Sequence, residues 1–321
     1  MPDGAARLAE IGVPVHGELG RPFRGIRYVS DSLEASGVFP DAPGWGIRRT
    51  ALHEALRRRA EDVGVELQWG VKVEGLDARG FATSAGRVEA SWLIGADGRK
   101  SSVRRMAGLA AKPARRRRFG VRRHFEIVPL TDHVEVHWAD GAEAYVTPVS
   151  QNEVGVAVLW SGGAGRFDGL MERFPMLRQR LAGAPARSRD RGAGPLENRS
   201  RDVVRGNLAL VGDASGYLDA ISGEGLALAF HHSAAVVDAI EAGDLRLYRR
   251  AHRQIARYPA AVTHLLLLLG ERPWLRRRVV RSLANDTALM DRFLTLKMSS
   301  ARPKLLGSGG LIRLTLAALK A

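Results

Sequence analysis

The chain has 321 residues, of which 45% are hydrophobic and 6% aromatic, and its formal net charge is +15. This length allows one large domain or two modest domains with a substantial core. The absence of cysteine excludes disulfides, thiolate nucleophiles and cysteine-based metal sites, and it fits a cytoplasmic location.

The positive charge makes nucleic acid and acidic membranes candidate partners. The basic residues are nearly all arginines spread along the chain, however, and no nucleic-acid-binding motif accompanies their clusters. We therefore predict no nucleic-acid partner. The first residues lack the pattern of a signal peptide, and the apolar run at 265–269 is far shorter than a membrane span.

The first third of the chain alternates between helical and strand-like patterns. In order, the periodicity predicts a helix over 1–13, strands over 25–30 and 33–39, and a helix over 51–63. Thr50 is expected to cap the second helix, and Glu54 falls near the capping-box position. Short strands separated by turn residues then predict a β-meander over 65–69, 71–76, 80–83 and 88–90.

An apolar strand over 92–96 ends in Asp97-Gly98, and the serines that follow can cap a helix. From 119 to 161 the rhythm predicts a sheet of about four antiparallel strands. His133, Glu135 and His137 lie on one face of one of these strands, because side chains repeat every two residues. A metal needs a third ligand nearby, so an exposed polar face is the favoured interpretation and no metal site is predicted.

The segment from 207 to 230 has the pattern of a strand, a loop and a helix. A helix over 167–181 and a return segment over 182–205 lead to it. Its strand, 208–211, ends in Gly212-Asp213, and Gly223-Glu224-Gly225 opens a helix of apolar residues. A helix N-terminus without side chains in the way suits an anionic or electron-rich ligand. An ionised Asp at a strand end only accepts hydrogen bonds, which suits a sugar-like hydroxyl.

The C-terminal part is helical and cationic. Helices are predicted over 245–257, 260–269, 274–284 and 288–296. These helices and the apolar segment 311–316 are candidates for covering a lipophilic pocket or for peripheral membrane contact. Packing onto the sheets is the favoured interpretation.

The strand ends at Asp97-Gly98 and Gly212-Asp213 resemble the two FAD motifs of the para-hydroxybenzoate hydroxylase-like flavoproteins. This group includes aromatic hydroxylases, geranylgeranyl reductases and flavin-dependent halogenases. The resemblance implies that Asp213 holds the ribitol chain of FAD. It also implies that the amides of Gly223, Glu224 and Gly225 face the pyrimidine end of the isoalloxazine. Asp97 and Gly98 would then touch the pyrophosphate region.

A third segment, around Arg49, also resembles these flavoproteins. The spacing of Arg49, Leu52 and Leu56 after a glycine-rich turn resembles the helix that packs beside FAD in the same group. In that group an arginine lies near the cofactor, and either Arg48 or Arg49 is its equivalent here. Ala220 stands where many relatives have proline.

The resemblance implies an α/β (α+β) fold with a truncated Rossmann-like FAD-binding domain, an inserted antiparallel β-sheet substrate domain and a C-terminal helical region. The implied FAD-binding domain covers 1–117 and 197–245, the inserted substrate domain 118–196 and the helical region 246–321. The expected Gly-x-Gly-x-x-Gly turn is absent from the sequence, so about forty residues of a βαβ unit are expected to be missing. A chain without them is expected to bind FAD weakly or not at all.

The implied activity is that of an FAD-dependent oxidoreductase, in the first instance an NAD(P)H-linked monooxygenase that acts on a small or lipophilic organic substrate. Around Tyr145 and Pro148 the chain lacks the aromatic signatures of prenyl reductases and halogenases. Two alternatives remain: a geranylgeranyl reductase-like alkene reductase acting on a lipid-like substrate, and a non-catalytic remnant that binds a partner. No acid–base residue is assigned, since His231 and His232 fit packing or surface positions.

Overall fold

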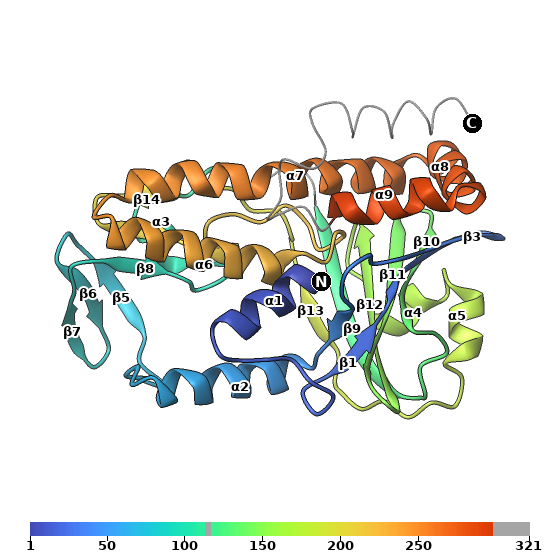
Figure 1. The fold of residues 1–321 in the computed structure, drawn as a ribbon, viewed down its shortest axis with the longest axis horizontal. Coiled ribbons are helices and arrows are strands. Elements are labelled where there is room, and N and C mark those ends of the chain that lie inside the picture. Colours follow the sequence, from blue (N-terminus) through green and yellow to red (C-terminus); the bar gives the residue numbers. More distant parts are fainter. Residues whose placement is uncertain (113–116, 298–321) are drawn as a thin grey trace.

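The computed structural model describes residues 1–112 and 117–297 and has the expected α/β fold. A seven-stranded sheet forms one side of the molecule, and two three-stranded sheets lie on the other side (Figure 1). Long C-terminal helices run across both parts. The cavity between the two sides is walled by segments that are far apart in the sequence.

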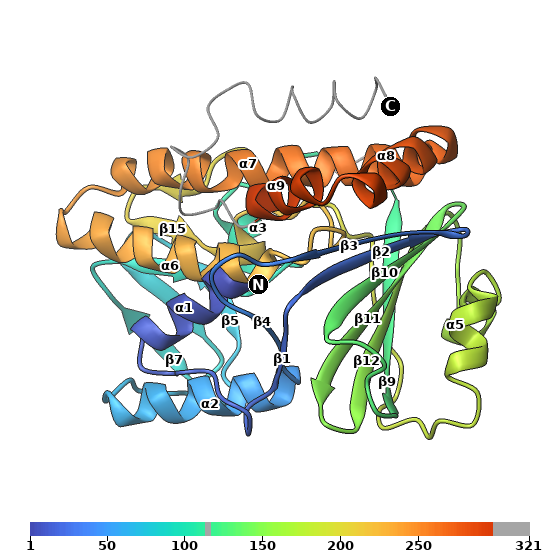
Figure 2. The same ribbon diagram turned by 45° about the vertical axis from the view of Figure 1, so that its right-hand side comes forward.

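The seven-stranded sheet has the order β13-β9-β12-β11-β10-β2-β3. Its strands are β2 (Gly25–Ser30), β3 (Leu33–Val38), β9 (Arg118–Glu126), β10 (His133–Ala139), β11 (Ala142–Ser150), β12 (Glu153–Ser161) and β13 (Arg191–Ala193). Strands β9 to β12 form the predicted antiparallel sheet. β2 extends it by pairing in parallel with β10, which places Ile26 beside Val134 (Figure 2).

The two faces of this sheet have different neighbours, because side chains alternate along each strand. Val156 and Val158 have 0% exposure and pack in a core with α4 (Phe167–Met171) and α5 (Pro175–Arg180). The prediction of one helix over 167–181 was wrong, since Pro175 begins a second helix after a break. The opposite face of the sheet looks into the cavity.

The other side of the molecule contains a three-stranded sheet in the order β14-β15-β8. Its strands are β14 (Val204–Arg205), β15 (Leu208–Leu210) and β8 (Leu93–Gly95). β15 and β8 are parallel, with Leu210 opposite Gly95. The segments that follow them, η1 (Gly212–Ala214) and the turn before α3 (Ser102–Met106), therefore begin at the same edge of the sheet.

The N-terminal elements are α1 (Pro2–Glu10), β1 (Arg21–Phe23), β4 (Gly44–Gly46) and α2 (Arg49–Asp62). The capping-box prediction for α2 was wrong. The helix begins at Arg49, so Thr50 lies inside it, and the N-cap residue Arg48 makes no side-chain hydrogen bond. The Glu54 carboxylate instead accepts hydrogen bonds from Arg57 and Arg58.

The predicted meander has one strand fewer than expected. It consists of β5 (Val73–Leu76), β6 (Gly80–Thr83) and β7 (Gly86–Glu89). The segment 65–69 is not a strand. Val65 and Trp69 remain 51% and 62% exposed, so no core stabilises an extended conformation there.

The C-terminal helices are α6 (Gly225–Glu241), α7 (Leu245–Glu271), α8 (Pro273–Asn285) and α9 (Thr287–Lys297). The predicted break near 258–259 was wrong, because α7 continues through Pro259. Its buried residues Val262 and Leu266 pack in the core beyond the proline, which offsets the lost backbone hydrogen bond. None of the helices in the described ranges is both long and apolar enough to cross a membrane. Segment 311–316 lies outside the described residues.

Candidate functional site

The cavity between the two sides of the molecule has a volume of about 910 Å³, a size typical of ligand pockets. Its walls come from the seven-stranded sheet, the edge of the β14-β15-β8 sheet, the start of α6, and helices α1 and α2. Among the predicted site residues, six line it: Arg49, Gly98, Gly212, Asp213, Gly223 and Gly225. Gly98, after β8, and Gly212 and Asp213, after β15, thus line the same cavity.

Asp213 lies in the turn after β15 and lines the cavity. A Cβ atom built on Gly225 would be 3.9 Å from its Oδ1 atom, so this carboxylate lies beside the start of α6. Burial raises the pKa of Asp213, while the positive charges of Arg49 and Arg99 act in the opposite direction. The carboxylate is therefore a hydrogen-bond acceptor that is partly shielded from water.

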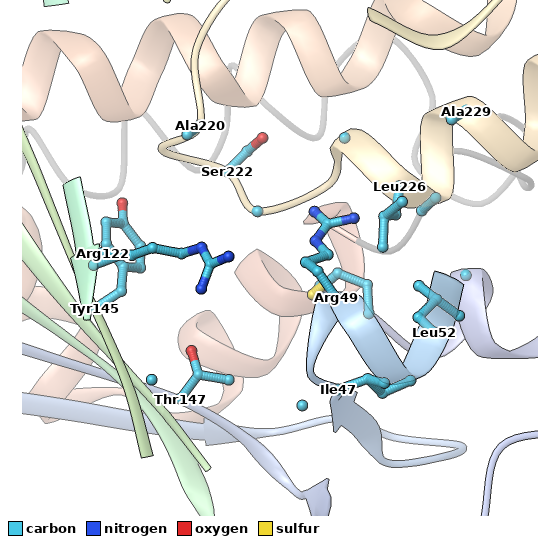
Figure 3. A pocket seen from close by; sticks show the side chains of 18 of the residues that line it. Ile47, Arg49, Leu52, Arg122, Tyr145, Thr147, Ala220, Ser222, Leu226 and Ala229 are labelled. Carbon is cyan, nitrogen blue, oxygen red and sulfur yellow. The ribbon is translucent and has the colours of Figure 1, made fainter. Parts of the chain in front are cut away.

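The start of α6 presents backbone to the cavity (Figure 3). Gly223 has φ of 71°, and a Cβ atom at this position would contact no other atom within 4 Å. The first amides of a helix have no intrahelical acceptor, and those of α6 begin at Gly225. Glu224 is only 4% exposed and is absent from the cavity wall. The turn therefore offers amides and a helix dipole to a ligand.

Asp97 has a different place from Asp213. Its Oδ2 atom accepts hydrogen bonds from the Ser102 amide at 2.7 Å and from the Val103 amide at 3.1 Å. The carboxylate thus caps α3, while the adjacent Gly98 and Arg99 line the cavity. A direct contact between Asp97 and a cofactor stays a prediction.

Arg104 connects the two strand-end loops. Its guanidinium donates to the carbonyl of Ala214 at 2.8 Å and to that of Arg99 at 2.9 Å. Because Arg104 is buried, with 6% exposure, this link holds the η1 segment against the turn that follows β8. The sequence motif around α3 therefore positions the cavity wall.

The structure distinguishes Arg48 from Arg49. Arg48 forms an ion pair with Glu153 of β12. Arg49 points into the cavity (Figure 3), where burial lowers its pKa and the neighbouring Asp213 and Tyr217 partly counteract that effect. Arg49 is therefore the arginine available to a ligand.

The sheet side of the cavity carries polar side chains that the sequence did not identify as site residues. Arg122 and His124 of β9, Tyr145 of β11 and Arg191 of β13 all line it. Arg122 points toward the space occupied by Arg49 from the opposite wall (Figure 3). The alternation along β9 places Arg122 and His124 on one face. This alternation was the only sequence feature that could have identified them as cavity residues.

A buried ionic cluster attaches the turn before α6 to the sheet. Arg118 of β9 donates from Nε to Asp219 Oδ2 at 2.9 Å and forms an ion pair with Glu143 of β11. The Tyr145 hydroxyl donates to the carbonyl of Ile221 at 2.8 Å. These contacts fix the position of the glycine turn relative to the sheet.

The expectation of an exposed polar face at His133, Glu135 and His137 was wrong. Glu135 and His137 are 2% and 8% exposed, because the Glu135 carboxylate accepts hydrogen bonds from Arg180 at 2.7 and 2.8 Å and contacts His137 Nε2 at 2.7 Å. Within the described ranges, no group of three or more His, Cys, Asp or Glu side chains is arranged to hold a metal ion.

The fold matches those of solved flavin enzymes. A triple mutant of the flavin-dependent brominase Bmp2 superposes with a TM-score of 0.82 at 15% identity, over 100% of this chain and 88% of the brominase. A flavoprotein/dehydrogenase from Cytophaga hutchinsonii gives a TM-score of 0.83 at 16% identity, over 99% and 87% of the two chains. Klebsiella pneumoniae HpxO, solved with FAD and uric acid, gives 0.74 at 19% identity, over 93% and 86%.

No protein-family model matches the chain, and no curated protein matches it in sequence. The chain therefore shares its fold with flavin-dependent halogenases and related flavoproteins, at identities too low to carry an activity across.

Proposed function

We propose that this protein is an FAD-dependent oxidoreductase whose isoalloxazine end binds in the cavity between α6 and the seven-stranded sheet. The observation that carries the proposal is the convergence of Arg49, Asp213 and the Gly223–Gly225 turn on one cavity. These residues come from three separate segments, and each has the chemistry that a flavin requires. The likeness in fold to HpxO, which was solved with FAD, supports the proposal.

The residues present fit the flavin end of FAD. Gly223 leaves the backbone open where a side chain would project into the cavity. The amides and dipole of α6 suit the electron-rich pyrimidine edge of the flavin ring. Asp213 suits a ribityl hydroxyl, since its carboxylate only accepts hydrogen bonds. Arg49 supplies a positive charge for the anionic part of the cofactor.

The flavin, when bound, supplies the redox chemistry, and the protein binds it, orients it and sets its electrostatic surroundings. The apolar side chains of Phe23, Leu159 and Leu226 line the same cavity and give it an apolar wall. We further propose NAD(P)H as the reductant and hydroxylation of an organic substrate as the reaction. We expect that substrate to bind against the face of the seven-stranded sheet that lines the cavity, on the side away from Gly223.

Flavin binding by the purified chain tests the proposal. Titration of the protein into FAD and, separately, into riboflavin should quench flavin fluorescence in a saturable manner, with weak affinity for FAD because the sequence has no Gly-x-Gly-x-x-Gly turn for its ADP half. Riboflavin lacks the ADP half of FAD, so it tests the flavin end of the site alone. We expect Arg49→Gln to weaken FAD binding about tenfold, because a charge-assisted hydrogen bond contributes about 1.5–3 kcal/mol.

Arg58→Gln is the matched control. Arg58 lies on the same helix, but its side chain is 70% exposed and outside the cavity, so affinity for FAD should not change. Absence of saturable quenching with both flavins would contradict the proposal and favour a non-catalytic protein that retains the fold.

A further inference from the structure

We propose that the substrate of this site is an organic carboxylate with an apolar body, and that Arg122 binds its carboxylate. The proposal rests on the proposed function, because it names the substrate class of the same cavity. It is carried by the order of side chains on the cavity floor, the part of the seven-stranded sheet from β13 to β10 that lines the cavity. This order changes from cationic on β13 and β9 to apolar on β10.

The first row of this floor follows from the strand register. Arg122 of β9 is opposite Ala157 of β12, Ala157 is opposite Tyr145 of β11, and Tyr145 is opposite Val136 of β10. Residues paired across neighbouring strands point to the same face of a sheet. All four residues line the cavity. The row therefore runs from a guanidinium through a small residue and a phenol to an aliphatic side chain.

The neighbouring row repeats this order. His124 is opposite Gly155, and Gly155 is opposite Thr147. On β10, Val134 precedes Glu135, which is paired with Val146 next to Thr147. The cavity is lined by His124, Gly155, Thr147 and Val134. Arg191 of β13 is paired with Arg122 and adds a second positive charge at the same edge. The floor thus has a cationic edge at β13 and β9 and an apolar edge at β10.

The cationic edge lacks a compensating charge. In the part of the chain that the structure describes, no carboxylate pairs with Arg122. Its Nη1 atom is 3.2 Å from His124 Nδ1. Burial and the positive charges of Arg48, Arg49 and Arg191 lower its pKa. A bound anion would relieve this repulsion, and the planar guanidinium matches a carboxylate with two parallel hydrogen bonds.

The centre of the floor has room for the body of such a ligand. Ala157 has only a methyl group and Gly155 has no side chain, and both line the cavity. A larger residue at either position would occupy the space between the charged edge and Val136. A carboxylate at Arg122 therefore directs its apolar body over Ala157 toward β10.

Binding of 2-naphthoate, compared with its uncharged analogue 2-naphthamide, tests this assignment. Isothermal titration of the chain without flavin should show at least about a tenfold preference for the carboxylate, since one charge-assisted hydrogen-bond pair contributes about 1.5–3 kcal/mol. Arg122→Met should abolish the preference, and Arg122→Lys should retain part of it. Ala157→Leu should weaken naphthoate binding while leaving binding of acetate unchanged.

Arg189→Met is the control, because it removes the same charge from an exposed position outside the cavity. It should leave the preference intact. Equal binding of naphthoate and naphthamide, or a preference that survives Arg122→Met, would overturn the proposal. Tighter binding of 2-naphthyl phosphate than of naphthoate would overturn the assignment to a carboxylate.

Riboflavin titration of the same variants separates the two proposals. Loss of riboflavin binding in every form, together with a carboxylate preference that depends on Arg122, would contradict the flavin site and support the anion site. Riboflavin binding with no carboxylate preference would do the reverse. Circular dichroism of each variant establishes that a lost preference reflects the site and not an unfolded chain.

Discussion

Asp213 is a residue at which ligand binding and stability oppose each other. Burial raises the pKa of this carboxyl above its usual 3.8 despite the nearby Arg49 and Arg99. A raised folded-state pKa means that its contribution to stability is fully present below 3.8 and is lost as the pH rises through the folded-state pKa. The charged form is therefore kept at neutral pH at the expense of stability.

We expect Asp213→Asn to raise the Tm at pH 7 by about 2 °C, because the neutral amide has no charge to bury. The difference should shrink toward zero as the pH falls toward 3.8. The same variant should weaken riboflavin binding about fivefold, since an amide is a weaker acceptor than a carboxylate. Thermal melts over a pH series and flavin titrations measure both effects.

Asp202→Asn provides a control of opposite sign. The hydrogen bonds that the Asp202 carboxylate accepts from Arg249 and from the Val203 amide lower its pKa against the effect of burial. Its replacement should therefore lower the Tm at pH 7. A lower Tm for both variants would show that the Asp213 carboxylate is stabilising and would contradict the argument that its buried charge costs stability.

Sequence reasoning identifies the residues whose position depends on local structure. Asp213 and Gly223 follow a strand end and open a helix, and both patterns are contained within a short stretch. Arg122 is different, because its role depends on which face of β9 meets the cavity. That face is decided by pairing with β12 and by the packing of Val156 on α4, neither of which the stretch around Arg122 contains.

At the scale of elements, the cluster of Arg118, Glu143 and Asp219 joins the sheet to the turn before α6. Arg118 lies on β9, Glu143 on β11 and Asp219 in the turn, and all are at most 6% exposed. One buried guanidinium thus contacts two buried acidic side chains. Removing it would leave both acids without their cation, and breaking a buried ion pair in this way costs about 3–5 kcal/mol.

We therefore expect Arg118→Met to lower the free energy of unfolding by about 3–5 kcal/mol in urea denaturation. Adding Glu143→Gln to this variant should recover about 1–2 kcal/mol, because the two residues are coupled. Arg187→Met is the control, since its ion pair with Glu126 is exposed and should contribute less than about 1 kcal/mol. Additive effects of Arg118→Met and Glu143→Gln would contradict the coupling.

Element types follow from the sequence better than their connections do. The periodicity predicts β2 and β3 correctly, yet it does not indicate that β2 pairs in parallel with β10 more than a hundred residues later. The stop predicted at Pro259 fails for a related reason. Local preference ends the helix there, but packing of Leu266 in the core continues it.

At the scale of the whole molecule, the cavity is lined by separate segments whose relative positions must be maintained for a ligand to bind. Helix α6 presents its N-terminus to the cavity, and α7 packs along α6 without lining the cavity (Figure 1). The contact between the two helices contains a stacked pair, His232 and His252, with ring centroids 4.2 Å apart. His252 Nε2 also contacts Ser215 Oγ at 2.9 Å, so this pair lies directly behind the η1 turn.

These histidines make global stability depend on pH. Burial lowers the pKa of His232 to about 3 and that of His252 to about 4. For a lowered folded-state pKa, stability is fully present above the unfolded pKa of 6.5 and is lost as the pH falls toward these values. Burial raises the pKa of Glu143 to about 7, so its contribution has the opposite sign over the same range.

We expect His232→Phe to remove one part of the acid sensitivity while preserving ring packing against Tyr248. Relative to the difference at pH 7.5, the variant should gain about 2 kcal/mol over the wild type at pH 5, because only the unfolded wild type takes up that proton. Urea denaturation at both pH values measures the gain. His16→Asn, which alters an exposed histidine, should show none. An equal response of both variants would place the acid sensitivity elsewhere than at the α6–α7 contact.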